Sequence, residues 1–239
     1  MCKTIAIIFA GGIGQRLNHQ DGIPKQFLLL DEKPVIIHTL DLFECNHLVT
    51  DIIVVCLDSW ITKLEKLLQE YSISKVVRII PGGSNTQESI FKGLCEAEKL
   101  VHGEDAIVLI HDGVRPLICN QTITDNVESV KQLGTCITCA LPTETIIINH
   151  TSGREVPRRN NLLVARAPQS FWLSNIIEVH RQALEDGITN FVDCCEMMHH
   201  YDKPMNMVLG PTENLKITTI ADFYMCEALL KLRKEHGQL

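Results

Sequence analysis

Glycines followed by two cations make the first segment of the chain suited to phosphate chemistry. Residues 10–16 read Ala-Gly-Gly-Ile-Gly-Gln-Arg, and Lys25 follows shortly afterwards in a Pro-Lys-Gln stretch. Glycines let backbone N–H groups approach a triphosphate without obstruction from side chains. The charges of Arg16 and Lys25 can offset that of the phosphates. We therefore predict a nucleotide-binding loop formed by Ala10, Gly11, Gly12 and Gly14, with Arg16 and Lys25 at the phosphates.

This loop differs from the two best-known phosphate-binding motifs. A P-loop would continue with Gly-Lys-Ser or Gly-Lys-Thr, and the dinucleotide fingerprint would have a third glycine where Leu17 stands. Either cation alone could be an ordinary solvated surface residue. The combination of glycines, an arginine and Pro-Lys directly after a strand-like run is far less expected by chance, so it favours nucleotide binding.

A carboxylate and a second guanidinium follow a later apolar run. Residues 111–116 read His-Asp-Gly-Val-Arg-Pro, directly after the strand-like residues 106–110. Open α/β sheets bind their ligands at the carboxyl ends of the strands, and a carboxylate there suits the Mg²⁺ of a nucleotide. We predict that Asp112 binds Mg²⁺ and that Arg115 meets the substrate. The alternative is a structural ion pair between the two residues.

A third segment could recognise the base of a nucleotide. Residues 82–84 read Gly-Gly-Ser and precede a helix-like stretch that contains Ser89. Backbone and hydroxyl groups of Gly83, Ser84 and Ser89 suit the edge of a base. The alternative is an ordinary turn with a helix N-cap.

Strand-like and helix-like segments alternate along the chain and predict where these groups lie. The apolar runs 5–9, 51–56, 76–80, 106–110 and 136–141 are typical of buried strands, and residues 35–43, 60–71, 87–100 and 123–133 have helical periodicity. The alternation predicts an α/β fold with a doubly wound, mostly parallel, Rossmann-like sheet. Residues 172–184, 192–200, 205–209 and 220–232 continue with ordinary α/β segments.

The alternation breaks after Pro142. Short β-like runs at 145–148 and 162–165 flank the polar residues 150–161. We interpret residues 143–166 as a protruding β-arm within a single nucleotidyltransferase domain that covers residues 1–239. Further along, Lys216 stands between Leu215 and Ile217 in a β-like run, where an interior lysine needs a purpose.

Composition argues against several classes of protein. The formal net charge of −7 disfavours a nucleic-acid-binding surface, which needs a basic excess. No apolar run approaches the roughly 20 residues of a membrane span, and no signal sequence precedes the first strand, so we expect a cytoplasmic protein. We interpret the ten cysteines as mainly buried free thiols. Cys136 and Cys139 should point to opposite faces of a strand rather than share a metal.

Taken in order, the motifs resemble those of one enzyme family. They are the loop at 10–16, Pro-Lys-Gln-Phe at 24–27, Gly82-Gly83 with Ser89, the motif at 111–116, Ala-Pro-Gln-Ser-Phe at 167–171 and Asn-Leu-Lys-Ile-Thr at 214–218. They recur in family order from residue 5 to about residue 230. The chain is similar to the 2-C-methyl-D-erythritol 4-phosphate and ribitol-5-phosphate cytidylyltransferases.

The resemblance implies a reaction and a set of roles. The enzyme would transfer CMP from CTP to a small polyol phosphate and release pyrophosphate. The catalytic cations around the α-phosphate would be Arg16, Lys25 and Lys216. Cytosine would lie against Gly83, Ser84 and Ser89, and the acceptor would meet Asp112, Arg115, Thr145 and Arg159. Thr145 and Arg159 belong to the arm, which in this family mediates a homodimer and carries its arginine into the neighbouring subunit's site.

Some positions depart from the family pattern. An arginine is frequent in the segment after the two glycines, where this chain has Ser84-Asn85-Thr86. Ala167, preceded by Arg166, and Val192 each stand where the family has a threonine. These departures can alter the acceptor pocket. The long stretch from Arg16 to Lys25 is closer to the ribitol type, so ribitol 5-phosphate is slightly favoured over 2-C-methyl-D-erythritol 4-phosphate.

Two other functions remain open at this point. A sugar-1-phosphate nucleotidyltransferase would share the glycine loop and a later lysine, but it fits residues 111–116 and 214–218 less well. A catalytically silent nucleotide-sensing module would keep the sheet and the loop, but it has no need of Lys25, Asp112 and Lys216. Pyrophosphate release from CTP with a polyol phosphate distinguishes these functions.

Overall fold

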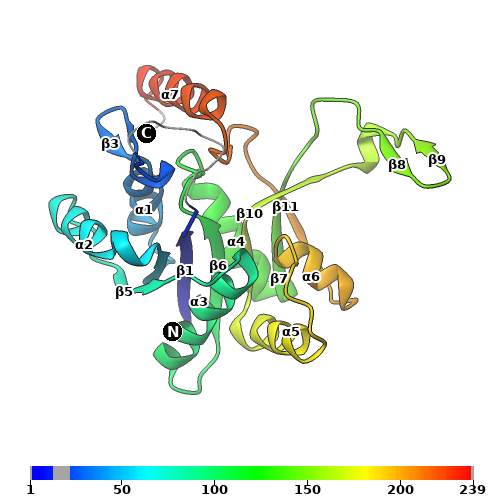
Figure 1. The fold of residues 1–239 in the computed structure, drawn as a ribbon, viewed down its shortest axis with the longest axis horizontal. Coiled ribbons are helices and arrows are strands. Elements are labelled where there is room, and N and C mark those ends of the chain that lie inside the picture. Colours follow the sequence, from blue (N-terminus) through cyan, green and yellow to red (C-terminus); the bar gives the residue numbers. More distant parts are fainter. Residues whose placement is uncertain (1, 13–21, 238–239) are drawn as a thin grey trace.

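A seven-stranded sheet forms the centre of the computed structural model, which describes residues 2–12 and 22–237 (Figure 1). The strand order is β11-β7-β10-β6-β1-β4-β5. The strands are β1 (Lys3–Ala10), β4 (Asp51–Cys56), β5 (Val76–Pro81), β6 (Ala106–Asp112), β7 (Thr135–Ala140), β10 (Val164–Trp172) and β11 (Met207–Leu209). All neighbours pair in parallel except β10, which is antiparallel to both β6 and β7. The predicted doubly wound, mostly parallel α/β fold is confirmed.

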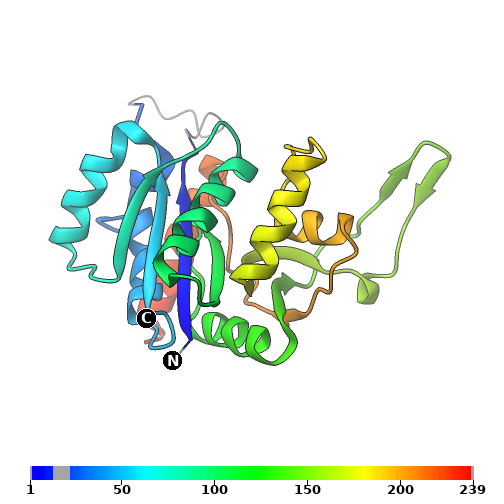
Figure 2. The same cartoon turned by 90° about the horizontal axis from the view of Figure 1, so that it is seen from below.

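Helices cover both faces of this sheet (Figures 1 and 2). One face packs against α1 (Val35–Cys45), α2 (Ile61–Glu70) and α4 (Asn120–Leu133), and the other packs against α3 (Thr86–Val101), α5 (Leu173–Glu185) and α6 (Cys194–His200). Alternate residues of each strand enter the two cores. Ala6 and Ile8 join the first, whereas Ile5 and Ile7 join the second, because successive strand side chains point to opposite faces.

The same alternation separates the two cysteines of the Cys-x-x-Cys spacing. Cys136 belongs to the core under α4, and Cys139 belongs to the core under α5 and α6. The prediction that they face opposite sides of a strand is confirmed. Cys56 and Cys226 are buried as expected, but Cys2 and Cys45 are exposed, so the expectation of mainly buried thiols holds for only part of the set.

A third, smaller core lies beside the sheet under α7 (Ile220–Glu235). It joins residues of the short hairpin β2 (Leu29–Leu30) and β3 (Lys33–Pro34) to Leu117, Ile217 and Leu230. The short 3-10 helix η2 (Lys25–Phe27) precedes this hairpin, and η3 (Asp58–Trp60) precedes α2. This core therefore brings the Lys25 segment and the residues around 217 together, although they are far apart in the chain.

A hairpin extends away from the body between β7 and β10 (Figures 1 and 2). It consists of β8 (Ile148–His150), β9 (Gly153–Glu155) and the 3-10 helix η4 (Arg159–Asn161). The excursion after Pro142 is found where predicted. Its strands differ from the prediction. The predicted run 145–148 contributes only Ile148, and of the run 162–165 only Val164 and Ala165 form strand, as the start of β10, a nine-residue strand of the main sheet. Among the described residues, no helix is both long and apolar enough to cross a membrane.

Candidate active site

The glycine segment and the carboxylate of residue 112 meet where β1 and β6 end. These strands are neighbours in the sheet, with Phe9 in register with Asp112. The N–H of Gly113 also donates to the carbonyl of Phe9 at 3.0 Å. In the sheet, β1 lies between β4 on one side and β6 on the other, so the order of the strands reverses at β1. Doubly wound sheets bind their ligands at such a reversal of strand order. Gly11 and Gly12 continue from β1 at the edge of the sheet where Asp112 ends β6.

Asp112 forms two ion pairs. Its Oδ1 lies 2.6 Å from Nζ of Lys216, and its Oδ2 lies 2.7 Å from Nε of Arg115. Burial raises the pKa of this carboxyl group, but the charges of Arg115 and Lys216 outweigh burial and lower it to about 2. The carboxylate is therefore ionised at neutral pH. Asp112 is thus paired with Arg115, and both residues line a cavity. The binding of Mg²⁺ by Asp112 and of substrate by Arg115 stays a prediction.

His111 cannot act as a base here. It is fully buried and its ring lies 5.1 Å from that of Phe43. Burial lowers its pKa to about 3, so the imidazole is neutral under ordinary conditions. The neutral ring thus packs against Phe43 in the interior of the structure.

The segment 214–217 connects the two groups of cations. Arg115 donates through Nη1 to the carbonyl of Asn214 at 3.0 Å, and Lys25 donates through Nζ to the carbonyl of Ile217 at 2.8 Å. Lys216 lies between these two anchors. Residues 215–217 form no strand in the structure, and the Lys216 side chain is 43% exposed. The predicted β-like run is therefore wrong at this point. The backbone carbonyls of Asn214 and Ile217 accept hydrogen bonds from the side chains of Arg115 and Lys25 rather than from a neighbouring strand.

Lys25 is positioned by its own short helix. The adjacent Gln26 is fully buried and donates to the carbonyl of Ala10, the last residue of β1. A Cβ added to Gly12 would lie 3.7 Å from Cε of Lys25, so this lysine reaches the glycine segment. Gln26 and Asn214 were not among the predicted site residues, although both stand in the motifs that carry the resemblance. Gly14 and Arg16 lie outside the described residues.

The turn before α3 is organised by its own side chains. Ser89 Oγ accepts from the N–H of Gly83 at 2.9 Å and donates to the carbonyl of Asn85 at 2.8 Å. The N–H and hydroxyl of Ser84 both donate to Glu88 at 2.7 Å. The structure thus brings Gly83, Ser84 and Ser89 together as predicted. Several of their donors are already paired within the turn, so Ser89 shapes the backbone of this segment.

A cavity of about 240 Å³ opens beside Asp112, Arg115 and Lys216. Its other walls come from β10, from the start of α3 and from the segment before α6. All three positions that depart from the family pattern, Thr86, Ala167 and Val192, line it, as does Arg166. The three departures therefore share one cavity, and their effect on the acceptor stays a prediction.

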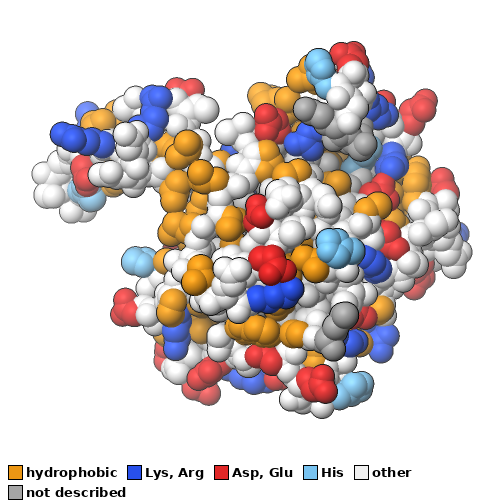
Figure 3. All heavy atoms as spheres, turned by 180° about the vertical axis from the view of Figure 1, so that it is seen from behind, with side chains coloured by type: hydrophobic (Ala, Val, Ile, Leu, Met, Phe, Trp, Pro, Cys, Tyr) orange, Lys and Arg blue, Asp and Glu red, His pale blue; other side chains and the backbone are white. Residues whose placement is uncertain are grey.

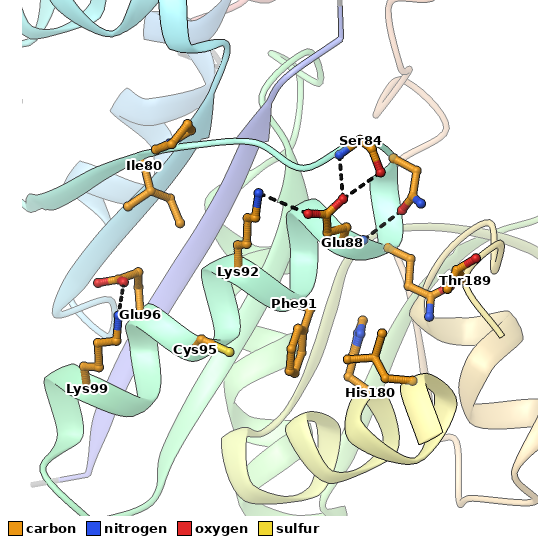
Figure 4. Close-up of a pocket in the computed structure, with 14 residues that line it drawn as sticks. Ile80, Ser84, Glu88, Phe91, Lys92, Cys95, Glu96, Lys99, His180 and Thr189 are labelled. Atoms are coloured by element: carbon orange, nitrogen blue, oxygen red, sulfur yellow. Dashed lines mark hydrogen bonds and ion pairs between the residues drawn. The ribbon is translucent and has the colours of Figure 1, made fainter. Parts of the chain in front are cut away.

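A larger cavity of about 760 Å³ lies elsewhere, between α3 and α5 (Figure 4). Its floor is apolar, with Phe91 stacked on His180 at a ring separation of 5.9 Å. The lysines on its rim are each paired with a glutamate: Lys92 with Glu88 and Lys99 with Glu96. These pairs leave little positive charge for phosphates. The smaller, cation-lined cavity is therefore the better reaction site.

The arm residues stand apart from this cavity. Thr145 and Arg159 are exposed, and neither lines the pocket beside Asp112. Within a single chain the structure does not bring them to the other predicted site residues.

The residues present fit a metal ion only in combination with a bound nucleotide. Among the described residues, no group of three or more His, Cys, Asp or Glu side chains could hold a metal. Asp112 is the carboxylate at the glycine segment. Mg²⁺ commonly takes one or two carboxylates, with substrate phosphates and water completing its octahedron, and a single aspartate suits that arrangement.

Comparisons with known proteins agree with this geometry. The family model described as IspD, 2-C-methyl-D-erythritol 4-phosphate cytidylyltransferase, matches residues 4–232. A ribitol-5-phosphate cytidylyltransferase of Streptococcus agalactiae is 44% identical over 233 residues, which cover 97% of this chain and 96% of that protein. A 2-C-methyl-D-erythritol 4-phosphate cytidylyltransferase of Clostridium botulinum is 32% identical over 233 residues, which cover 97% and 99%.

Solved structures show the same fold. The crystal structure of 4-diphosphocytidyl-2C-methyl-D-erythritol synthase from Anaerococcus prevotii superposes with a TM-score of 0.83. It is 23% identical, and the match covers 96% of each chain.

Proposed function

We propose, since the chain belongs to the 2-C-methyl-D-erythritol 4-phosphate cytidylyltransferase family, that it transfers CMP from CTP to ribitol 5-phosphate and releases pyrophosphate. The chain is a cytidylyltransferase of polyol phosphates. The choice of acceptor is supported by the higher identity to a ribitol-5-phosphate enzyme, 44%, than to a 2-C-methyl-D-erythritol 4-phosphate enzyme, 32%.

The observation that carries the proposal is the gathering of cations at the end of β1 and β6. Lys25 approaches the glycine segment, and Lys216 and Arg115 flank the carboxylate of Asp112. A phosphate oxygen of the acceptor would attack the α-phosphorus of CTP, and the bond from that phosphorus to the bridging oxygen of pyrophosphate would break. The attacking oxygen is already ionised near neutral pH, so positioning and charge neutralisation suffice without a general base.

The individual roles follow from position. Lys25, Lys216 and Arg16 would offset the charge that builds up when two polyanions meet at the α-phosphate. Asp112 would hold Mg²⁺, which when bound supplies further charge neutralisation to the triphosphate. Arg115 would meet the acceptor, and the turn at Gly83, Ser84 and Ser89 would meet cytosine.

The arm supports a proposal about assembly. Residues 143–166 would pair two copies of the chain, and Thr145 and Arg159 would complete the acceptor site of the partner. Five large apolar side chains are exposed along the arm: Ile147, Ile148, Val156, Leu163 and Val164. Apolar residues also gather where the arm joins the body (Figure 3). Exposed apolar surface of this kind is typical of protein interfaces.

A pyrophosphate-release assay tests the reaction. The purified protein is mixed with CTP and Mg²⁺ and with ribitol 5-phosphate, 2-C-methyl-D-erythritol 4-phosphate or a sugar 1-phosphate. We expect the highest kcat/KM with ribitol 5-phosphate. A higher value with another polyol phosphate would overturn the acceptor, and no release with any of them would favour the silent nucleotide-sensing module.

The donor is tested in the same assay. We expect CTP to be used at least tenfold better than ATP or GTP, because the compact turn at residues 82–89 suits a pyrimidine better than a purine. This factor corresponds to about 1.4 kcal/mol of discrimination. Equal turnover with a purine nucleotide would contradict the role given to this turn.

A further inference from the structure

Arg166 occupies an irregular part of β10 at the edge of the reaction cavity. Ala165 pairs with Cys139 of β7, and the next pair along the strand is Gln169 with Ile137, so the register shifts between them. Bulges of this kind redirect side chains and are frequent beside active sites. Here the irregularity carries Arg166 into the wall of the cavity that also contains Asp112 and Lys216.

Among the described residues, no carboxylate forms an ion pair with the guanidinium of Arg166, and Glu213, which lines the neighbouring cavity, acts on it only through its charge. Nη1 of Arg166 donates to the carbonyl of Asn214 at 2.6 Å, and the same oxygen accepts from Arg115 at 3.0 Å. Its Nε is buried and unpaired, and among the described residues Arg166 forms no ion pair within 4.0 Å. Two guanidinium groups sharing one carbonyl oxygen leave positive charge that an anion can neutralise.

The other charges of the cavity do not remove this surplus. Its lining contains three cations, Arg115, Arg166 and Lys216, and two carboxylates, Asp112 and Asp193. Asp112 already faces Arg115 and Lys216. Asp193 accepts hydrogen bonds from Gln169 and from the N–H of residue 196 at the start of α6. Glu213 acts on Arg166 from the adjoining cavity but forms no ion pair with it. Within the lining of this cavity, Arg166 is therefore the cation that is not neutralised by an ion pair among the described residues.

The order of the strands in the sheet indicates which of the two substrates lies beside Arg166. The glycine segment and the turn at residues 82–89 follow β1 and β5, on one side of β6. Arg166 belongs to β10, on the opposite side of β6. It also lines a second cavity, of about 530 Å³, together with Thr143 and Glu144 at the base of the arm. If the glycine segment and the turn at residues 82–89 hold the nucleotide, Arg166 faces the acceptor.

We propose that Arg166 binds the phosphate group of the acceptor and thereby restricts the acceptor to phosphorylated polyols. This inference rests on the proposed function and names a contact within the same site. Arg166 stands next to Ala167, whose small side chain leaves room in the cavity and whose carbonyl is held by Nδ2 of Asn214 at 2.7 Å. At this part of the cavity the positive charge thus comes from Arg166, because the side chain of Ala167 is apolar.

Steady-state kinetics of Arg166→Gln and Arg166→Lys test the proposal. For Arg166→Gln we expect the KM for ribitol 5-phosphate to rise about tenfold to a hundredfold, the range for one charged hydrogen-bonding group. The KM for CTP should stay within about threefold of the wild-type value. Arg166→Lys should recover part of the loss, because it keeps the charge. Arg181→Gln, which removes an exposed arginine paired with Glu98, is the matched control and should change neither constant.

A binding measurement separates this proposal from the proposed function. Inorganic phosphate is titrated calorimetrically into wild-type and Arg166→Gln protein saturated with CTP and Mg²⁺, and we expect at least tenfold weaker binding to the variant. If phosphate binding depends on Arg166 but no polyol phosphate is turned over, the proposed reaction fails and the anion site stands. An unchanged acceptor KM, an equal rise in the KM for CTP, or unchanged phosphate binding would each overturn the role of Arg166.

Discussion

Lys216 is the residue whose replacement should affect the chemical step most selectively. Its ammonium lies 2.6 Å from Asp112, and its side chain is 43% exposed toward the cavity. A lysine at the α-phosphate acts most strongly when negative charge develops in the transition state. We therefore predict that Lys216→Ala lowers kcat by roughly a hundredfold to a thousandfold, or about 2.7–4 kcal/mol, and weakens CTP binding much less.

Kinetics and calorimetry with CTP measure the two effects separately. Lys131→Ala is a suitable control, since Lys131 forms an exposed ion pair with Glu128 on α4. It should leave kcat unchanged. The assigned role would be wrong if Lys216→Ala kept kcat within a few-fold of the wild-type value, or if the whole loss appeared as weaker CTP binding.

At the scale of elements, the hydroxyl of Ser89 is one of the groups that order the turn between β5 and α3. Ser89 Oγ holds the N–H of Gly83 and the carbonyl of Asn85. In Ser89→Ala the N–H of Gly83 loses its partner, whereas the carbonyl of Asn85 keeps the backbone N–H of residue 89, so the turn is less well ordered before the nucleotide binds. We predict that the KM for CTP rises about fivefold, the factor that corresponds to about 1 kcal/mol, while kcat changes little.

The control for this turn is Ser129→Ala. Ser129 donates to the carbonyl of Thr135 at 3.1 Å, so this variant also removes one bond between a side chain and the backbone, but on α4. It should leave the KM for CTP unchanged. A Ser89→Ala enzyme with unaltered CTP kinetics would show that the turn does not position the base.

At the scale of the whole molecule, the arm predicts sites shared between two subunits. We expect a dimer by light scattering and a loss of activity in Arg159→Ala. Mixing Arg159→Ala with Lys216→Ala should restore activity, because each mixed dimer has one site with an intact Lys216 and the partner's intact Arg159. Random exchange would give about a quarter of the wild-type activity. A fully active monomer, or mixtures no better than the separate variants, would contradict the shared site.

Acid stability is a second property of the whole molecule. Burial lowers the pKa of His111 to about 3 and that of His180 to about 4, whereas both titrate near 6.5 in the unfolded chain. The unfolded state therefore binds more protons below that value, and the free energy of unfolding falls as the pH drops from 6.5 toward 4. Each histidine should account for about 1 kcal/mol between about pH 7 and pH 5.5.

Urea unfolding at these two pH values measures this effect. His180→Leu removes one of the two titrations, so its loss of stability on acidification should be smaller by about 1 kcal/mol. His102→Leu, at the exposed end of α3, serves as the control and should behave like the wild type. An equal loss in His180→Leu and in the wild type would show that burial of this imidazole does not govern the acid response.

The sequence by itself determined much of the local structure. The apolar run 51–56 is a strand with those bounds, and the helical stretch 87–100 lies within α3. Both elements are predicted from the spacing of apolar residues over a few positions of the chain, and this spacing can be read without knowing the fold. The placement of the glycine segment and Asp112 at one edge of the sheet also follows, because parallel neighbouring strands end at the same edge.

The tertiary structure decided how distant segments meet. The run at 162–165 continues into β10, an antiparallel strand between β6 and β7, and no local pattern specifies which strands it joins. Asn214 contacts Arg115 and Arg166, 99 and 48 residues away, while Lys25 reaches Ile217 across 192 residues. Such contacts depend on sheet order and on packing under α7. A one-dimensional pattern therefore predicted charged residues near phosphates, but only the folded chain showed that Arg166 lines the same cavity as Asp112 and Lys216 and donates there to a carbonyl oxygen.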